Sequence, residues 1–349
     1  MSQKSDIRAE AERLRGLFEA EGAEVFEAEI LQPAGALLNV YGEDIRARAF
    51  VTLDPLRGEM MLRPDFTVPL VQRHIEAGRA AAKYTYAGEI FRRQEDDETR
   101  PTEYMQVGYE VFGGSEPEAD AEVFAQVANA LDGLPVTAAT GDLGILTAAV
   151  EALETPERRK KALLRHLWRP ARFKALLDRF SQPAPPPPPV PAADIPHVGL
   201  RSHGEIQSRI QLLEDEHNTA PIAAGEVERL AAILAVNDRA PKAVETLRSI
   251  ANGGSALGGA VERLAARLDA LSDAGVEPSQ LQFEASYGRT SMEYYSGFVF
   301  GFSADHAPAV ATGGRYDLLT EALGSGTQLP AVGAVIRPDA VLAVRGALA

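Results

Sequence analysis

The chain has 349 residues, 45% of them apolar, and its 50 acidic residues outnumber 35 basic ones to give a net charge of −15. This length permits one large domain or two of ordinary size, each with a substantial core. The absence of cysteine excludes disulfides and thiolate metal sites. The acidic balance disfavours a nucleic-acid surface, because tracking phosphates requires clustered Lys and Arg.

The first 18 residues alternate charged and apolar side chains at helical spacing and contain no apolar core of a secretory signal. No apolar run approaches the roughly 20 residues that a membrane helix needs. The six histidines show no paired metal-ligand spacing. We therefore expect a cytoplasmic protein without a metal or cofactor.

The first part of the chain alternates helical and strand patterns. Apolar residues at helical spacing predict a helix over 5–22, and a Gln-Pro pair ends the strand expected at 25–30. A hairpin is expected from two strands around a Pro- and Gly-containing turn. The remaining expectations to residue 153 are strands 49–53, 59–62, 83–91, 103–112 and 136–140, and helices 67–77, 117–132 and 143–153.

From about residue 155 to 275 helical periodicity dominates, interrupted by the proline run 183–191. That run predicts a stiff, solvated polyproline II spacer in preference to a docking motif. Strands return at 281–285, 294–302 and 330–337, with a turn-rich stretch around 304–317, a helix over 318–323 and a final helix. Strand clusters in hairpins, interspersed with helices, indicate an antiparallel α+β sheet.

The segment 103–112 carries the most informative pattern. One face of the predicted strand presents apolar residues that suit packing on a helix. On the other face Gln106 and Glu110 point the same way, separated by Gly108. Glycine inside a strand often marks the close approach of a ligand or another backbone, so the two polar groups could grip a small polar molecule. From this strand alone, an ordinary sheet with one solvated face remains an equal alternative.

Two further motifs resemble parts of a pocket. Tyr294 and Tyr295, followed by Ser296-Gly297, are predicted to open a strand with paired hydroxyl-bearing rings beside a glycine, although such tyrosines are more often packing residues. Residues 313–317, GGRYD, predict a turn in which the glycine pair permits positive φ or close backbone approach.

Taken together, these motifs resemble the catalytic domain of class II aminoacyl-tRNA synthetases of the histidyl type. The resemblance covers roughly residues 5–140 and 280–345 and leaves the helical stretch outside it. It implies a class II synthetase-like core over 1–141 and 280–349, with a mostly helical insertion over 142–279. Six motifs carry the resemblance in the family's order: LRPDFT (62–67), YAGEIFR (86–92), YMQVGYEVFG (104–113), MEYYSGFVF (292–300), GGRYD (313–317) and PAVGAVI (330–336).

The resemblance also implies a histidine pocket. In the family, residues matching Asp65, Thr67 and Gln106 hold the ammonium of the amino acid, and those matching Glu110 and Tyr295 hold the imidazole. A carboxylate with neutral acceptors suits an ammonium, and an imidazole needs a partner for each ring nitrogen. The candidate histidine-binding residues are Asp65, Thr67, Arg92, Gln106, Glu110, Tyr294 and Tyr295.

The nucleotide positions depart from the family. Arg92 keeps the motif 2 arginine, but Gln94 replaces the glutamate used near adenine and Thr102 replaces the second arginine of that motif. The catalytic arginine falls on Thr290, beside Arg289, and the motif 3 arginine falls on Ala340. Each missing cation removes about 10²–10³ in rate from adenylate formation, so no catalytic residues are expected. Arg289 or Arg315 could substitute only if its side chain pointed the right way.

These omissions match one branch of the family, the regulatory subunits of ATP phosphoribosyltransferase. The chain also ends where a synthetase would continue into an anticodon-binding domain, so no tRNA partner is expected. The resemblance implies a homodimer within a hetero-oligomer containing the short catalytic subunit. It also implies activation of that subunit and allosteric feedback by free histidine in the first step of histidine biosynthesis.

Three alternatives stay open at this point. The chain could be another synthetase paralogue that binds or transfers a different amino acid, or an active histidyl-tRNA synthetase, against which Thr290 and Ala340 argue. It could also be an unrelated scaffolding protein, since a fold alone does not decide function.

Overall fold

The computed structural model describes residues 3–35, 49–93, 101–189, 200–251, 256–289, 294–304, 309–324, 326 and 328–346. Its main element is a nine-stranded sheet in the order β1-β5-β6-β12-β11-β10-β7-β9-β8. The pairs β1–β5 and β7–β9 are parallel and the others are antiparallel, so the expected antiparallel sheet is correct in its central strands and mixed near its edges. The strands of this sheet are β1 (Glu24–Val25), β5 (Ala82–Phe91), β6 (Glu103–Phe112), β7 (Thr137–Asp142), β8 (Asn237–Arg239), β9 (Gln282–Glu284), β10 (Phe298–Ser303), β11 (Ala311–Arg315) and β12 (Ala331–Ile336).

One face of the sheet is covered by helices from both ends of the core. Helices α1 (Lys4–Ala20), α4 (Glu116–Ala130) and α13 (Pro338–Gly346) pack against β6 and β12. The apolar face predicted for 103–112 lies here: Val107 and Tyr109 are fully buried, and the Tyr109 ring stacks on Phe18 with centroids 4.9 Å apart. The opposite face is flanked by α3 (Thr67–Ala77) and α12 (Asp317–Leu323).

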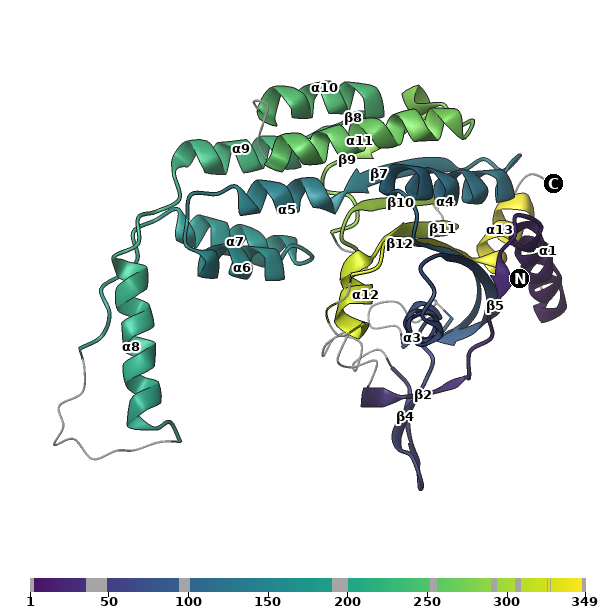
Figure 1. The fold of residues 1–349 in the computed structure, drawn as a ribbon, viewed down its shortest axis with the longest axis horizontal. Helices are drawn as coiled ribbons and strands as arrows, with labels where there is room; N and C mark the ends of the chain where they lie inside the picture. Colours follow the sequence, from purple (N-terminus) through teal and green to yellow (C-terminus); the bar gives the residue numbers. More distant parts are fainter. Residues whose placement is uncertain are drawn as a thin grey trace.

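A small second sheet projects from the core as a hairpin (Figure 1). It consists of β2 (Leu31–Pro33), β3 (Val51–Asp54) and β4 (Gly58–Leu62) in the order β2-β4-β3. The predicted hairpin is therefore confirmed. The strand expected over 25–30 is wrong in extent, because pairing stops after Val25 and resumes only at Leu31.

Helices make up most of the stretch between β7 and β9, which lies to one side of the sheet (Figure 1). Helix α11 packs on α4 and α5, and the apolar cluster of the core continues into these helices. Strand β8 joins the edge of the main sheet through β9. The division at residues 142 and 279 remains a proposal. The helices are α5 (Leu143–Glu151), α6 (Glu157–Arg165), α7 (Pro170–Phe180), α8 (His203–His217), α9 (Ala224–Leu234), α10 (Ala240–Ala251) and α11 (Ala256–Asp273), followed by a 3₁₀ turn at Pro278–Gln280.

The proline run follows α7 and precedes α8, which projects away from the sheet (Figure 1). Its described residues, 183–189, form neither helix nor strand, and residues 190 and 191 lie outside the described part. The Ala184 carbonyl lies 2.8 Å from Nδ1 of His217, the last residue of α8. The run is thus attached to α8 at one point, and its role as a spacer remains a prediction.

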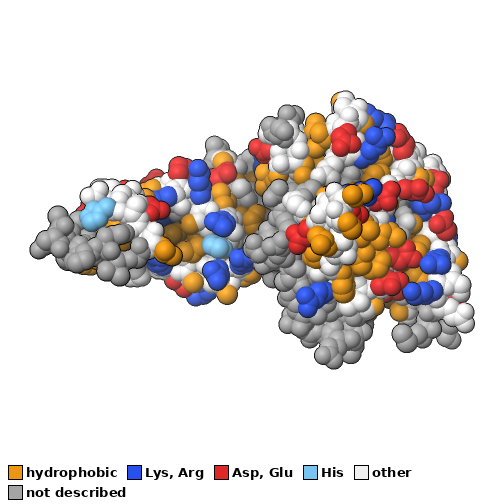
Figure 2. All heavy atoms as spheres, turned by 90° about the horizontal axis from the view of Figure 1, so that it is seen from below, with side chains coloured by type: hydrophobic (Ala, Val, Ile, Leu, Met, Phe, Trp, Pro, Cys, Tyr) orange, Lys and Arg blue, Asp and Glu red, His pale blue; other side chains and the backbone are white. Residues whose placement is uncertain are grey.

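Seen from below, Lys and Arg side chains surround a histidine on the helical part of the molecule (Figure 2). Exposed arginines lie at the end of α6, just before α7 and within α7, and their charges lower the pKa of His166 in addition to the larger effect of burial; they are Arg165, Arg169 and Arg172. The net charge of the whole chain, −15, gives no indication of this local basic surface. None of the helices that the structure describes combines the length and apolar character needed to cross a membrane.

Candidate functional site

A small cavity of about 70 Å³ opens on the sheet face opposite α1 and α4. All seven residues predicted from the sequence line it, brought together from the start of α3, the end of β5, β6 and the turn before β10. The complete lining is Asp65, Thr67, Arg92, Gln106, Glu110, Tyr294, Tyr295, Thr312, Tyr316, Gly333, Ala334 and Val335.

Glu110 lines the cavity and is 2% exposed. Its Oε1 accepts hydrogen bonds from the hydroxyls of Tyr86 at 3.0 Å and Thr67 at 3.4 Å, and its Oε2 accepts one from Tyr316 at 2.6 Å. Burial raises the pKa of Glu110 to about 7, against the lowering effect of the hydrogen bonds. The carboxyl group can therefore exchange a proton near neutral pH.

Two glycines make room for this arrangement. Gly108 faces Tyr86 across the β5–β6 ladder, and a Cβ on Gly108 would lie 2.0 Å from Tyr86 Cζ. Gly333 of β12 faces Glu110, and a Cβ there would lie 1.4 Å from Glu110 Oε2. The space beside Gly108, between Gln106 and Glu110, exists as predicted. The ring of Tyr86 occupies it, so it is not space for a ligand.

Hydrogen-bond acceptors gather on one side of the cavity. Gln106 is 5% exposed, and its buried Oε1 has no hydrogen-bond partner among the residues that the structure describes. Asp65 is 3% exposed and its Oδ1 accepts from the Val68 amide at 3.4 Å, which holds it at the first turn of α3. An unpaired buried acceptor is costly, so a ligand that donates hydrogen bonds beside Gln106 is favoured.

Arg92 follows directly after β5 and reaches back towards the residues before α3. Its Nε donates to the Pro64 carbonyl at 2.7 Å, and its Nη2 lies 3.8 Å from Asp65 Oδ2. Arg92 therefore contributes a cation at the rim and also holds the segment that carries Asp65.

Tyr294 and Tyr295 line the cavity from a turn and not from a strand, since β10 begins only at Phe298. The prediction that residues 294–297 open the strand is wrong. The Ser296 amide still donates to the Arg315 carbonyl at 2.8 Å, but its hydroxyl accepts from the Asp317 amide at 3.1 Å and diverts the chain. Burial raises the pKa of Tyr295, so its hydroxyl keeps its proton.

The predicted turn at GGRYD is also wrong. Gly313, Gly314 and Arg315 belong to β11, and neither glycine has positive φ. Close packing explains the pair, since a Cβ on Gly314 would lie 2.9 Å from the Tyr295 ring.

Sequence reasoning did not select Tyr86 and Tyr316, the two tyrosines that bond to Glu110. Tyr86 had a usable signal, because it stands opposite Gly108 in the ladder. Tyr316 lies inside a motif that was noted only for its glycines.

Comparisons with known proteins identify the lineage of this fold. The sequence profile of the histidyl-tRNA synthetase family matches residues 2–184 and 206–341. An ATP phosphoribosyltransferase regulatory subunit of Rhizobium etli (strain CIAT 652) is 32% identical over 90% of this chain and 92% of its own length. The corresponding protein of Brucella ovis (strain ATCC 25840 / 63/290 / NCTC 10512) is 30% identical over 95% of this chain and 96% of its own length.

The chain belongs to the histidyl-tRNA synthetase-like family of ATP phosphoribosyltransferase regulatory subunits. It is thus a regulatory subunit of histidine biosynthesis and not an enzyme in its own right.

Solved structures share the fold at lower identity. An ATP phosphoribosyltransferase regulatory subunit/histidyl-tRNA synthetase from Bacillus halodurans C superposes with a TM-score of 0.73 at 19% identity, covering 99% of this chain and 81% of the other. A histidine–tRNA ligase subunit from Alicyclobacillus acidocaldarius gives a TM-score of 0.63 at 20% identity, covering 100% of this chain and 96% of the other. The class II synthetase-like fold is therefore confirmed.

The arginines that could replace the lost ATP-binding cations are engaged elsewhere. Arg289 is 6% exposed; its Nε donates to the Leu167 carbonyl at 3.0 Å and its guanidinium lies 4.9 Å from the centre of the Phe173 ring. Arg315 pairs with Asp120 and does not line the cavity. Ala340 is buried in α13, whereas Thr290 and Gln94 lie outside the described residues.

Proposed function

We propose that the cavity binds free histidine as a feedback effector, and that the chain forms a homodimer within a hetero-oligomer that activates a short catalytic subunit. The cavity residues supply acceptors for an ammonium on one side and a proton-exchanging carboxyl group on the other. The observation that carries the proposal is that Glu110, buried among hydroxyls with a pKa of about 7, persists in a chain that lacks the synthetase's ATP-binding arginines.

The two ends of a histidine molecule fit the two sides of the cavity. Asp65, Thr67 and Gln106 would receive the ammonium, since Gln106 Oε1 bonds to none of the described residues. Glu110 would accept from one imidazole nitrogen, and Tyr295 would meet the other. Arg92 lies near Asp65 at the rim, where it suits the carboxylate of the amino acid.

Exposed apolar residues on the projecting hairpin support the homodimer. Leu53 is 77% exposed and Leu56 is 96% exposed, and Val51 on the same strand is 45% exposed. Apolar side chains gathered on one projecting element are typical of a subunit contact.

The catalytic partner is proposed from the names of the relatives, which are regulatory subunits of ATP phosphoribosyltransferase. Co-purification of the chain with a short ATP phosphoribosyltransferase, and restoration of activity on mixing, would test this part. Loss of that restored activity on adding histidine would test the feedback. If the mixture is active and histidine does not change its activity, the proposed partner is supported and the proposed feedback by histidine is contradicted.

A further inference from the structure

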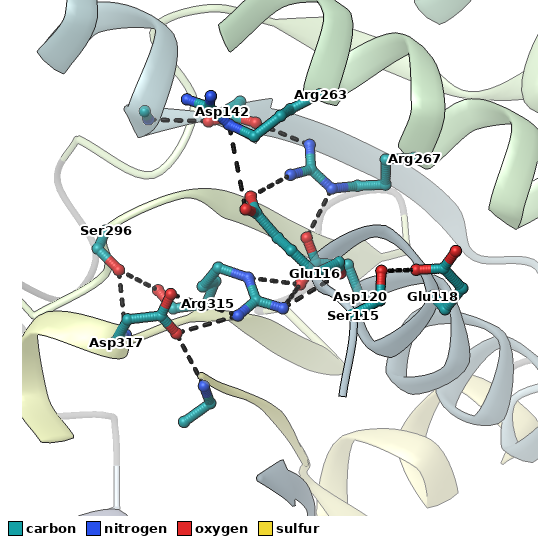
Figure 3. A network of polar contacts seen from close by, with 12 residues as sticks. Ser115, Glu116, Glu118, Asp120, Asp142, Arg263, Arg267, Ser296, Arg315 and Asp317 are labelled. Atoms are coloured by element: carbon teal, nitrogen blue, oxygen red, sulfur yellow. Dashed lines mark hydrogen bonds and ion pairs between the residues drawn. The ribbon is translucent and has the colours of Figure 1, made fainter. Parts of the chain in front are cut away.

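A buried ion network joins the inserted helices to the strand beside the cavity (Figure 3). Asp120 of α4 is fully buried and lies at its centre. Its Oδ2 accepts from Arg267 Nε at 2.6 Å, and its Oδ1 accepts from Arg315 Nε at 2.9 Å. One carboxylate thus connects an arginine of α11 with an arginine of β11.

Arg267 is fully buried and all of its guanidinium nitrogens are engaged. Nη1 donates to Asp142 Oδ2 at 2.7 Å, and Nη2 donates to Glu116 at 3.3 Å. The other oxygen of Asp142 accepts from the Gly144 amide at 2.8 Å and caps α5. Arg267 therefore attaches α11 to α4 and to the junction of β7 with α5.

On the side of the network nearest the cavity, both residues that flank Tyr316 in the chain are held by polar contacts. Arg315 is fixed by Asp120, and Asp317 accepts from Arg315 Nη1 at 3.0 Å and from the Ala331 amide at 2.8 Å. Tyr316 lies between them and donates to Glu110 at 2.6 Å. A change in the position of Arg315 is therefore transmitted directly to the tyrosine that holds Glu110.

Charge makes this network sensitive to the loss of Arg267. Four carboxylates pair with the two buried arginines, and a further cation, Arg263, is half exposed at 4.0 Å from Glu116 (Figure 3). Without Arg267, Arg315 would remain as the buried cation for all four carboxylates in this part of the structure. Breaking a buried pair leaves an uncompensated charge, so Arg315 would have to move or a carboxylate would have to take up a proton. The four carboxylates are Glu116, Asp120, Asp142 and Asp317.

We propose that Arg267 is a positioning residue for the cavity, which acts through Asp120 and Arg315 to hold Tyr316 against Glu110. Consequently, if the attachment of α11 changes the affinity of the cavity for its ligand by some factor, the ligand changes the equilibrium of that attachment by the same factor, as linkage requires. The expected effect of Arg267 on ligand affinity rests on the proposed histidine binding, whereas its effect on the position of Tyr316 does not.

The first experiment needs no ligand. Amide hydrogen exchange over residues 311–323 is compared in the full-length wild type and in Arg267→Met, Arg267→Lys and Arg248→Met. Arg248→Met is the matched control, because Arg248 forms an exposed two-bond pair with Glu262 of α11 at 2.8 and 2.7 Å and makes no contact with Asp120. Circular dichroism establishes that each variant folds.

Arg267→Met should accelerate exchange over 311–323 by at least about 5-fold, the low end of ordinary coupling. Arg267→Lys, which keeps the charge and loses the planar fork, should lie between wild type and Arg267→Met. Equal exchange in Arg267→Met and Arg248→Met would overturn the proposal. If Arg267→Met does not fold, the comparison of Arg267→Lys with Arg248→Met decides in the same way.

The second experiment measures histidine affinity in a double-mutant cycle of Arg267→Met and Tyr316→Phe. If Arg267 acts through Tyr316, each single change weakens binding by about 5- to 10-fold and the double variant is no weaker than Tyr316→Phe alone. Additive losses would reject the route through Tyr316. If wild type binds no histidine, the proposed effector fails, and the exchange experiment still decides the role of Arg267.

Discussion

Tyr316 donates its hydroxyl to Glu110 at 2.6 Å although 206 positions separate the two residues in the chain. Tyr86 donates to the other carboxylate oxygen at 3.0 Å. Burial raises the pKa of both tyrosines, so both remain protonated donors. In the described part of the chain Glu110 is thus held by hydroxyls and not by a cation, so its carboxyl group stays available to a ligand.

Removing that carboxylate should weaken histidine binding. Glu110→Ala leaves an imidazole N–H unpaired in a buried site, at a cost of about 1–3 kcal/mol, or roughly 10- to 100-fold in affinity. Tyr295→Phe should cost less, because it removes one neutral hydrogen bond and keeps the ring. Isothermal calorimetry on wild type and both variants measures the effect. A Glu110→Ala protein that binds as tightly as wild type would place the effector site elsewhere.

Glu110→Ala and Tyr295→Phe should both leave assembly with the catalytic subunit largely intact. Both should weaken feedback inhibition by histidine, because the effect of histidine on the catalytic subunit is lost when histidine no longer binds.

Glu110 should also make stability depend on pH. The pKa of Glu110 in the folded chain, about 7, exceeds the ordinary value of 4.5, so the unfolded state loses this proton first. The contribution of this group to stability therefore falls as pH rises from 4.5 to 7, by a few kcal/mol at most. Glu110→Gln abolishes that titration. Its thermal midpoint relative to wild type should rise between pH 5 and pH 8, and a pH-independent difference would contradict the raised pKa.

Gly108→Ala should destabilise the core, because its Cβ would lie 2.0 Å from the Tyr86 ring. Displacing that ring also breaks its bond to Glu110, and overpacking of this kind costs about 1–3 kcal/mol. The matched control is Gly16→Ala in α1, where nothing lies within 4 Å of the added Cβ. That change should be neutral or stabilising by up to about 1 kcal/mol. Urea unfolding of the two variants separates the outcomes, and equal effects would argue against the clash.

The purified chain should not activate histidine, since Thr290 and Ala340 stand where the synthetase family has arginines and each lost cation removes about 10²–10³ in rate. The assay is histidine-dependent exchange of pyrophosphate into ATP, with an active histidyl-tRNA synthetase as the positive control. Exchange well above background would overturn the loss of catalysis.

The hairpin should contribute to the homodimer. Leu53→Asp introduces a charge where an apolar contact is proposed, and it should weaken self-association by at least about 10-fold. Leu212→Asp on α8, a residue 49% exposed, is the control and should leave the mass unchanged. Light scattering over a range of concentrations measures both. A Leu53→Asp protein with wild-type association would remove the hairpin from the interface.

The sequence was sufficient for those features that depend on local pattern. Alternation in 103–112 predicted β6 with its two faces, and the helix expected from about Thr67 to Ala77 is α3. Hydrogen bonds between distant segments were not predictable in this way. Residues 294–297 have strand-like composition, but the Ser296 hydroxyl bonds to the Asp317 amide and turns the chain.

In the cavity, too, contacts between distant segments could not be predicted from local pattern. The pattern of the strand had already singled out Gln106 and Glu110, but the full set of seven residues came from a family resemblance, and the structure places them together. Their role in binding histidine remains a prediction. Tyr86 was missed because Gly108 was interpreted as space for a ligand, whereas the register places the Tyr86 ring in that space. The network around Arg267 was not accessible from sequence at all, since Asp120 lies 147 positions away.

The order of strands has a consequence during synthesis on the ribosome. β6 ends at Phe112, but its partner β12 begins at Ala331. While the intervening chain is being made, the β5–β6 hairpin has a bare inner edge that carries the buried residues of the site. Unpaired edges of this kind recruit other strands. The nascent protein is therefore most prone to aggregation just before its last strand emerges, and truncations that remove β12 should accumulate as insoluble material.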